Sequence, residues 1–421
     1  MEHQEKYKVS VHYGWIIVFT GMLSICACLG LGRFAIGMLL PSMAATLKLT
    51  YTQMGFISTA NFIGYLASVL ISGHWSSEIG ARRLIFISLM VVGISMGLVG
   101  RATSFHQVLL LYMITGIGSG AANVTVMGLV SSWFSSSRRG RAAGFIVIGS
   151  GFAIIASGRL IPFINSIQGQ EGWRMNWMIL SAVVIAIACV SVLLIRNRPD
   201  DKGLQPMGAD EHLDMHSAEN RTETVKSVHK REINVYREKM IYFLGLIYFL
   251  FGYTYVIYAT FIVTTLVRER GFSEAVAGNF WSTVGFLSLF SGPVFGTLSD
   301  RLSRKTGLII VFAFQMISYL LVASGLPGVF LYLSIFFFGI VAWSIPSIMA
   351  AAVGDYVGAQ KAARAFGLVT FIFGFGQIAG PAVAGVLAEK TGSFSSSFLM
   401  AAGAVGIAIL LTSFLKKPVT A

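Results

Sequence analysis

Residues 183–195 read VVIAIACVSVLLI, a run without a single charged side chain. Polarity does not alternate along this run, as it would on a strand of a membrane β-barrel, where lipid-facing and lumen-facing residues take turns. Stretches of this kind recur along the whole chain, and short polar segments separate them. A helix needs about 20 mainly apolar residues to cross a bilayer. The sequence therefore predicts an all-α membrane protein.

The composition agrees with this prediction. Of 421 residues, 55% are hydrophobic and only 12% are charged, whereas about 25% of the residues of a soluble domain are charged. The mean hydropathy is +0.74. Twelve segments are candidates for spanning helices: 14–41, 52–73, 84–100, 107–134, 141–165, 173–195, 239–267, 274–298, 307–325, 329–353, 362–388 and 394–415.

The first segment is longer than the apolar part of a signal peptide, so we expect it to remain as a permanent span. The three cysteines, Cys26, Cys28 and Cys189, all fall inside predicted spans. Buried cysteines usually act as small apolar packing residues, and this is the role we expect here. A metal or redox pair at Cys26 and Cys28 is the alternative.

The formal net charge of +13 is distributed in a way that indicates membrane topology and not nucleic-acid binding. Arg33 and Arg159 fall within predicted spans, and the basic residues of one face are Lys48, Arg101, Arg174, Arg268, Arg270 and Lys390. The remaining Lys and Arg residues lie on the opposite side, in the tails and the other loops. Basic loops mark the cytoplasmic side of a membrane. We therefore expect a multi-pass protein of a cytoplasmic membrane with both termini in the cytoplasm.

One long polar stretch divides the chain. Residues 196–238 contain few apolar side chains and many charged ones, so we expect a flexible cytoplasmic linker between residues 1–195 and 239–421. The linker also carries acidic and histidine residues at alternate positions, which is a weak pattern for metal binding. These residues are Asp210, His212, Asp214 and His216. A solvated linker is the simpler interpretation, and no metal site is predicted.

The two halves repeat one another at a fixed offset of 223 residues. The shift maps Gly55 onto Gly278, Gly116 onto Gly339 and the pair 151–152 (GF) onto 374–375 (GF). A repeat unit of six spans has the same orientation in both copies, so an axis along the membrane normal relates the two six-helix bundles. Transporters with this architecture bind substrate near mid-membrane, between the halves.

Two loops at equivalent positions of the repeat carry a recognisable motif. Residues 73–83 read GHWSSEIGARR and residues 296–305 read GTLSDRLSRK. The second loop resembles the signature G-x-x-x-D-R-x-G-R-K of the major facilitator superfamily, with Ser303 in place of a glycine. The first loop departs further from the signature. Ser77 stands at the acidic position, and Glu78 and Ala81 stand at two of the basic positions. The resemblance covers the whole chain and implies the major facilitator fold.

The resemblance also implies a gate. A carboxylate beside a basic cluster at a helix end can pair with a neighbouring helix while one side of the carrier is closed, and separate when that side opens. In the second loop this role falls to Asp300, Arg301 and Arg304, and in the first to Arg82 and Arg83. Anchoring of basic loops at the cytoplasmic surface is the alternative explanation for all five.

Further segments narrow the resemblance. Residues 133–144 (WFSSSRRGRAAG) look like a loop of bacterial monocarboxylate and oxalate/formate-type carriers, whereas residues 30–34 (GLGRF) and 252–261 (GYTYVIYATF) look like a related uncharacterised bacterial branch. Small residues at 116–120 (GIGSG) and 376–381 (GQIAGP) predict close helix packing. Tyr112 stands where many superfamily members have an arginine, so the coupling role of that arginine is not carried over.

Arg33 is the main candidate for the substrate site. A charged group inside a span is costly, by about 2.5 to over 10 kcal/mol, so it is expected to face a cavity. No Asp or Glu lies deep in a predicted span to neutralise it. Gly30 and Gly37 lie near it on the helix and are expected to leave room for a ligand. An anionic substrate would supply the missing charge; the alternatives are bonds to backbone carbonyls or snorkelling to the surface. Arg159 is expected near the outer surface.

The other candidates are uncharged. The predicted substrate-binding residues besides Arg33 are Asn61, Asn123, Tyr253, Tyr255, Tyr258 and Trp343. Tyr65, Asn279, Trp281, Ser344 and Gln377 are further cavity candidates, and packing between helices is the alternative role for each. Spans 1, 4, 7 and 10 line the path in the family that the chain resembles. Together these residues predict an aromatic pocket with one fixed positive charge.

These features favour a transporter over two other classes of protein. A membrane enzyme would need a catalytic constellation, and the predicted spans contain no histidine–carboxylate or nucleophile–base pair. A sensor usually carries an additional signalling domain, for which the linker and tails are too short. We expect a secondary active transporter that moves a small organic anion, a monocarboxylate above all, by alternating access. The alternative is an efflux pump for amphipathic or drug-like compounds. No cofactor is expected. The expected partners are the small-molecule substrate, with or without a proton, and the lipid bilayer. The protein is expected to be a monomer.

Overall fold

The computed structural model describes residues 12–208 and 235–416, and these residues form helices almost throughout. The linker positions Asp210, His212, Asp214 and His216 lie outside the described residues. The first half contains α1 (Gly14–Ile25), the π-helix η1 (Cys26–Phe34), α2 (Ile36–Thr46), α3 (Tyr51–Ile79), α4 (Ala81–Val99), α5 (Phe105–Trp133), α6 (Ser136–Gln168) and α7 (Gly172–Leu194), with the short turns η2 (Gly169–Glu171) and η3 (Pro199–Lys202). The second half contains η4 (Val235–Arg237), α9 (Lys239–Thr264), the π-helix η5 (Thr265–Glu269), α10 (Glu274–Leu302), α11 (Arg304–Ala323), α12 (Val329–Val341), α13 (Ser344–Val357), α14 (Ala359–Thr391) and α15 (Ser395–Ser413).

The helices confirm the predicted spans. α1, η1 and α2 follow one another as the first span, and α12 and α13 together form the tenth. Within the described part of the chain, eleven helical segments are long and apolar enough to cross a membrane. The eighth predicted span, α10, is not among these eleven. It has 29 residues and packs against α6 and α12.

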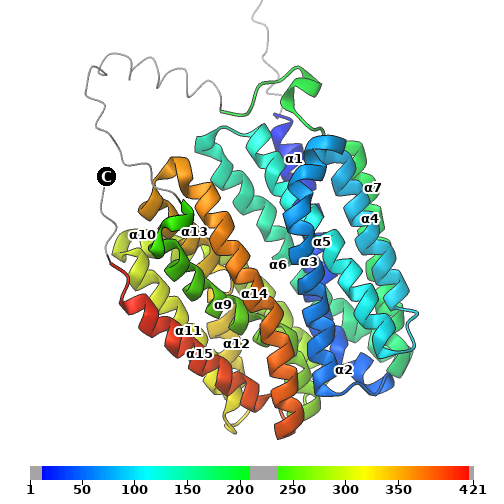
Figure 1. Cartoon of the computed structure of the whole chain (residues 1–421). Coiled ribbons are helices and arrows are strands. Elements are labelled where there is room, and N and C mark those ends of the chain that lie inside the picture. Colours follow the sequence, from blue (N-terminus) through cyan, green and yellow to red (C-terminus); the bar gives the residue numbers. More distant parts are fainter. Residues whose placement is uncertain (1–11, 209–234, 417–421) are drawn as a thin grey trace, which may run out of the picture.

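The helices form two six-span bundles that lie side by side (Figure 1). The first bundle runs from α1 to α7 and the second from α9 to α15. They meet mainly where α6 packs on α10 and where α3 packs on α14, and α2 also touches α9. The 223-residue offset maps α3 onto α10 and α6 onto α14, so the two main contacts between the bundles are equivalent under the repeat.

The bundles are tightly packed at the end where α3 and α10 begin, which we call the sealed end. A Cβ placed on Gly55 would lie 2.3 Å from the carbonyl oxygen of Pro381, and one on Gly158 would lie 2.5 Å from that of Gly278. These contacts are again equivalent under the offset, which relates Gly55 to Gly278 and Gly158 to Pro381. Only glycine allows backbones to approach so closely.

Hydrogen bonds between the bundles follow the same symmetry. The Thr59 hydroxyl donates to the carbonyl oxygen of Ile378 at 2.9 Å, and the Ser282 hydroxyl donates to that of Ile155 at 3.0 Å. The offset maps each donor onto the other donor and each acceptor onto the other acceptor. Closer to the sealed end, the Asn165 amide donates to Glu274 at 2.7 Å. The repeat is therefore present in the contacts as well as in the sequence.

The opposite end, where α1 begins and α7 and α15 end, is called the terminal end. Here the four helices of the boundary carry glycines with free space around them: a Cβ on Gly73, Gly144, Gly296 or Gly367 would meet no atom within 4 Å. In the first span residues 30–44 are all buried, and so are residues 254–266 of the seventh, whereas the first turns of α9 are partly exposed. The two bundles thus make close backbone contacts at the sealed end, and these four glycines of the terminal end make none.

Candidate functional site

Arg33 lies in a π-helical segment in the middle of the first span. This segment, η1, has the sequence CACLGLGRF and interrupts the regular helix between α1 and α2. π-helical turns are rare and often occur at functional sites. The space beside its glycines is filled: a Cβ on Gly30 would lie 2.1 Å from that of Ala153, and one on Gly37 would lie 2.7 Å from the Ala259 carbonyl oxygen. The prediction that Gly30 and Gly37 leave room for a ligand is therefore wrong, because both glycines serve close helix packing.

Arg33 is 6% exposed and its guanidinium contacts two aromatic rings of α3. Its Cζ atom lies 4.7 Å from the centre of the Phe62 ring and 3.9 Å from that of Tyr65. Cation–π contacts of this kind stabilise a buried guanidinium without neutralising it. Among the described residues, neither Nε nor Nη2 has a hydrogen-bond partner. These two atoms form the edge of the guanidinium that binds a carboxylate through two parallel hydrogen bonds.

Asn61, Tyr65 and Asn123 surround Arg33 on the side of the first bundle. The Asn123 amide donates to the Tyr65 hydroxyl at 2.7 Å, and the Asn61 amide donates to the Tyr112 carbonyl at 3.1 Å. Oδ1 of Asn61 is buried without a partner among the described residues. Arg33 and Asn61 also line a small cavity of about 10 Å³, which reaches Thr260 of the second bundle. The structure thus brings together the candidates of spans 1, 2 and 4.

Tyr255 and Trp343 form the opposite side, in the second bundle. Tyr255 is 3% exposed, receives a hydrogen bond from the Gln377 amide and lies within electrostatic reach of Arg33 and Tyr65. The Trp343 ring packs against Phe34 at 5.2 Å and meets Tyr255 edge-on at 5.9 Å. Its indole Nε1 is buried, again without a partner within the described structure.

A break in the tenth span positions Trp343. α12 ends at Val341 and α13 begins at Ser344, so Trp343 lies in the interruption. Its backbone N–H donates to the Ser291 hydroxyl at 3.1 Å, and the Ser344 hydroxyl donates to the Ser291 carbonyl at 2.9 Å. These two bonds fasten the break to α10 and account for Ser344 without a ligand.

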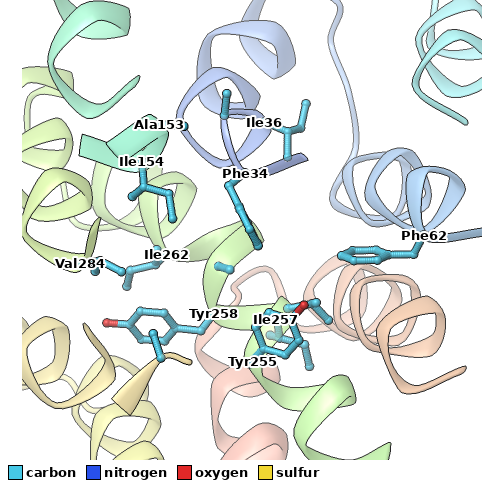
Figure 2. Close-up of a cluster of buried hydrophobic side chains, with 14 of the residues drawn as sticks. Phe34, Ile36, Phe62, Ala153, Ile154, Tyr255, Ile257, Tyr258, Ile262 and Val284 are labelled. Carbon is cyan, nitrogen blue, oxygen red and sulfur yellow. The ribbon is translucent and has the colours of Figure 1, made fainter. Parts of the chain in front are cut away.

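Two of the three predicted tyrosines of α9 point elsewhere. Tyr258 stacks on Phe338 at 4.0 Å and shares a hydrogen bond with Ser334 at 2.9 Å, inside the second bundle. Figure 2 shows that the Tyr258 hydroxyl points away from Phe34 and Phe62. The Tyr253 hydroxyl contacts the sulfur of Met400 on α15 at 3.3 Å. Of the three, only Tyr255 faces the region around Arg33.

The remaining candidates lie outside this site. Asn279 and Arg159 are exposed. Trp281 is 2% exposed and lies near Gly37, on the sealed side of Arg33. Gln377, in contrast, reaches the site through Tyr255.

The predicted gating residues of the second loop form a cluster within the second bundle. Arg304, at the start of α11, pairs with Asp300 of α10 and donates from Nε to Asp355 of α13 at 2.9 Å. It also donates to the Ser299 hydroxyl at 3.0 Å. Arg301 is exposed. The Arg304 contacts therefore join three helices of one bundle at the terminal end.

The predicted gating residues of the first loop have a different environment. Arg82 donates from Nε to the Val192 carbonyl at 2.6 Å and from its backbone N–H to Asn197 at 2.9 Å, while Arg83 is exposed. The offset maps Asp300, Arg304 and Asp355 onto Ser77, Ala81 and Ser132. The charged cluster of the second bundle thus has no counterpart in the first.

Sequence reasoning missed three residues of these two sites. Phe62 is a phenylalanine in an apolar helix, where no pattern distinguishes a site residue from a lipid contact. Tyr112 donates from its hydroxyl to the Arg33 carbonyl oxygen at 2.9 Å, a bond between spans that only the fold reveals. Asp355 was detectable as an acid at a helix end, but its partner lies 51 positions earlier.

Within the described residues, no group of three or more His, Cys, Asp or Glu side chains could hold a metal ion. Cys26 and Cys28 are free thiols. Chemically, the central site offers one unpaired guanidinium edge, two amides that hold tyrosine hydroxyls, and aromatic walls. It can bind and orient an anion.

Known proteins are similar over nearly the whole chain. The hexuronate transporter of Bacillus subtilis (strain 168) is 24% identical over 412 residues, which cover 92% of each protein. Monocarboxylate transporter 2 of Homo sapiens is 24% identical over 414 residues, covering 94% of this chain and 84% of that protein. Among solved structures, the D-xylose-proton symporter superposes with a TM-score of 0.74 at 16% identity, over 96% of this chain and 98% of that one.

A family model assigns the chain. The model described as "Uncharacterised MFS-type transporter YbfB" matches residues 25–413. This range includes every helix from η1 to α15. The chain belongs to this family of major facilitator transporters, and it is a multi-pass membrane protein.

Proposed function

We propose that this protein is a secondary active transporter of small organic anions, monocarboxylates in particular, and that Arg33 binds the carboxylate. The observation that carries the proposal is the unpaired Nε and Nη2 edge of Arg33, buried between the bundles with no acidic partner among the described residues. Burial of an unpaired charge is costly unless a counter-ion is bound. An anionic substrate supplies that counter-ion.

The similar proteins support the chemical class. One relative is named for hexuronate and another for monocarboxylates, and both names denote organic anions. Four further residues complete the proposed site. Asn61 shares a cavity with Arg33 and Asn123 bonds Tyr65 in the first bundle, and Tyr255 and Trp343 pack against each other in the second. Efflux of amphipathic compounds gains no support from these relatives or from a site built around one fixed charge.

We further propose that the terminal end faces the cytoplasm, in accordance with the basic loops at that end. The packed sealed end then closes the outer side, so the arrangement is one that opens inward. Transport would proceed as the bundles rock about Arg33, separating the glycine contacts of the sealed end and closing the terminal end. The Arg304 cluster, with Arg82, Arg83 and Arg301, would meet the opposite bundle in the outward-facing state.

Uptake into proteoliposomes tests the proposal. The purified protein would be reconstituted and supplied with radiolabelled acetate, lactate, benzoate and glucuronate. We expect saturable uptake of at least one of these anions, and we expect Arg33→Gln to lose it. Arg159→Gln is the matched control, because it removes an exposed arginine from α6 and should leave uptake unchanged.

Two results would contradict the proposal. The first is uptake by Arg33→Gln equal to that of the unaltered protein. The second is transport of uncharged or cationic compounds together with no transport of any anion in the panel.

A further inference from the structure

The polar and aromatic groups of the central site come from different bundles. The offset maps Arg33, Asn61 and Asn123 onto Val256, Val284 and Pro346, so the second bundle has no equivalent of the polar side. Conversely, Tyr255, Phe373 and Trp343 map onto Gly32, Ser150 and Gly120 of the first bundle. A substrate between the bundles therefore meets a cation on one side and aromatic rings on the other.

The aromatic side consists of four nearly parallel rings, which we call the aromatic wall: Tyr248, Phe251 and Tyr255 of α9 and Phe373 of α14. Phe373 and Tyr255 are 6.0 Å apart with an interplanar angle of 4°, and Phe373 and Tyr248 are 4.3 Å apart at 16°. Phe251 stacks on Tyr255 at 4.8 Å and 18°.

Two features hold the wall in place. The Gln377 amide donates to the Tyr255 hydroxyl and fixes that ring. Gly252 lets α9 approach α14, since a Cβ at this position would lie 2.6 Å from the Phe373 carbonyl oxygen. Tyr248, Phe251 and Tyr255 are buried and Phe373 is partly exposed, so Phe373 is the ring of the wall that a substrate can reach. Trp343 meets Tyr255 at 74° and forms a corner with the wall.

The wall lies close to the charge. Gly374, next to Phe373, packs on Leu66, next to Tyr65, because a Cβ on Gly374 would lie 2.8 Å from Leu66 Cδ1. The Tyr65 ring centre in turn lies 3.9 Å from the Arg33 Cζ atom. A planar ring attached to a carboxylate can pair its anion with Arg33 and stack on the wall at the same time. Offset stacking of aromatic rings is favourable beyond the burial of area alone.

Besides Arg33, the site leaves few polar atoms for a heavily hydroxylated substrate, namely Oδ1 of Asn61 and the indole Nε1 of Trp343. The amides of Asn123 and Gln377 already donate to tyrosine hydroxyls. A sugar acid would place several hydroxyl groups against the rings, and each hydroxyl buried without a partner costs free energy.

We propose that the preferred substrate is an aromatic carboxylate, with its carboxylate on Arg33 and its ring on the aromatic wall. This inference rests on the proposed function, because it requires Arg33 to bind the anion. It adds a class of substrate that the aromatic wall, and not Arg33, selects.

Competition binding tests it on the purified protein in nanodiscs. The competitors of labelled benzoate are unlabelled benzoate, cyclohexanecarboxylate, lactate and glucuronate. Cyclohexanecarboxylate has the same charge as benzoate but a ring that is not planar. We expect benzoate to bind about three- to tenfold more tightly than cyclohexanecarboxylate, as one aromatic contact predicts. The difference in affinity between benzoate and lactate, or between benzoate and glucuronate, should be larger.

Variants locate the effect. In Phe373→Leu, benzoate and cyclohexanecarboxylate should bind with about equal affinity, a ratio of about onefold. Retained binding of cyclohexanecarboxylate shows that the variant is folded. Phe375→Leu is the matched control, because Phe375 lies two residues away on α14 and is 48% exposed.

The outcomes separate the two proposals. If lactate, glucuronate or cyclohexanecarboxylate binds as tightly as benzoate, and Arg33→Gln abolishes this binding, the aromatic class is rejected and the organic-anion transporter stands. If no carboxylate binds in a manner that depends on Arg33, both proposals fail.

Discussion

The Cζ atom of Arg33 lies 3.9 Å from the centre of the Tyr65 ring, and the hydroxyl of the same tyrosine receives a hydrogen bond from Asn123. Tyr65 thus connects the charge on the first span with the fourth span. Its ring contacts the guanidinium, and Nε and Nη2 have no hydrogen-bond partner among the described residues. The orientation of Arg33 therefore depends on a residue that carries no charge.

Replacing Tyr65 tests this dependence. Tyr65→Leu removes the ring, and we expect the affinity for a carboxylate to fall about threefold to thirtyfold, the range that a cation–π contact of ~0.7–2 kcal/mol implies. Tyr65→Phe keeps the ring and should remain within about threefold of the unaltered protein. Isothermal titration gives the affinities. Tyr332→Leu, an exposed tyrosine of α12, is the control. Equal affinities for Tyr65→Leu and Tyr332→Leu would refute the role of the ring.

The glycine contacts of the sealed end should control which side is open. Gly278→Val introduces a side chain whose Cβ would lie 2.1 Å from the Gly158 carbonyl oxygen, so the bundles must separate there. We expect a longer distance between spin labels at Lys48 and Lys390, measured by double electron–electron resonance in a cysteine-free background. Gly296→Val, on the same helix with nothing within 4 Å, should leave the distance unchanged. An unchanged distance in Gly278→Val would contradict the assignment of the sealed end.

The two symmetry-related hydrogen bonds should contribute to the same equilibrium. Hydrogen bonds between helices in membranes are worth ~0.6 kcal/mol on average. Thr59→Val combined with Ser282→Ala should therefore shift the populations toward separation of the sealed end by about sevenfold. The spin-label pair Lys48 and Lys390 reports the populations. Thr297→Val, which removes an exposed hydroxyl bonded within its own helix, is the control. A double variant with the populations of this control would show that the two bonds do not hold the end closed.

The Arg304 cluster predicts that replacing Arg304 lowers the stability of the protein, whereas replacing the neighbouring Arg301 does not. Arg304→Gln breaks the pairs with Asp300 and Asp355 and loosens α10, α11 and α13. Because these groups are partly exposed, we expect a loss of no more than ~1 kcal/mol, visible as a lower Tm. Arg301→Gln, which removes an exposed charge, should keep the Tm of the unaltered protein. A Tm equally lowered in both variants would indicate a general effect of charge.

The spans and the repeat could be predicted because they depend on local composition and on a constant offset. Gly55 and Gly278 identified the repeat, and they proved to be equivalent contacts between the bundles. Arg33 stood out for a similar reason, since an arginine within an apolar span is conspicuous whatever surrounds it.

The orientation of side chains within the spans could not be predicted in the same way. α9 is apolar around its whole circumference, so no polar face indicated that Tyr255 would point toward Arg33 and Tyr258 toward Ser334. The π-helical turn of η1 further changes the direction of Arg33 relative to a regular helix. Gly30 and Gly37 were misread because a glycine gives no sign of whether a ligand or another helix occupies the space beside it.

The most direct test of the account compares an anion with its neutral isostere on one arginine. Equilibrium binding of benzoate and benzamide, two planar molecules of nearly equal size, would be measured on the unaltered protein, on Arg33→Gln and on Arg159→Gln. We predict that the unaltered protein and Arg159→Gln bind benzoate at least about tenfold more tightly than benzamide, and that Arg33→Gln loses this discrimination. Equal discrimination in all three proteins would contradict the claim that Arg33 binds the negative charge of the substrate.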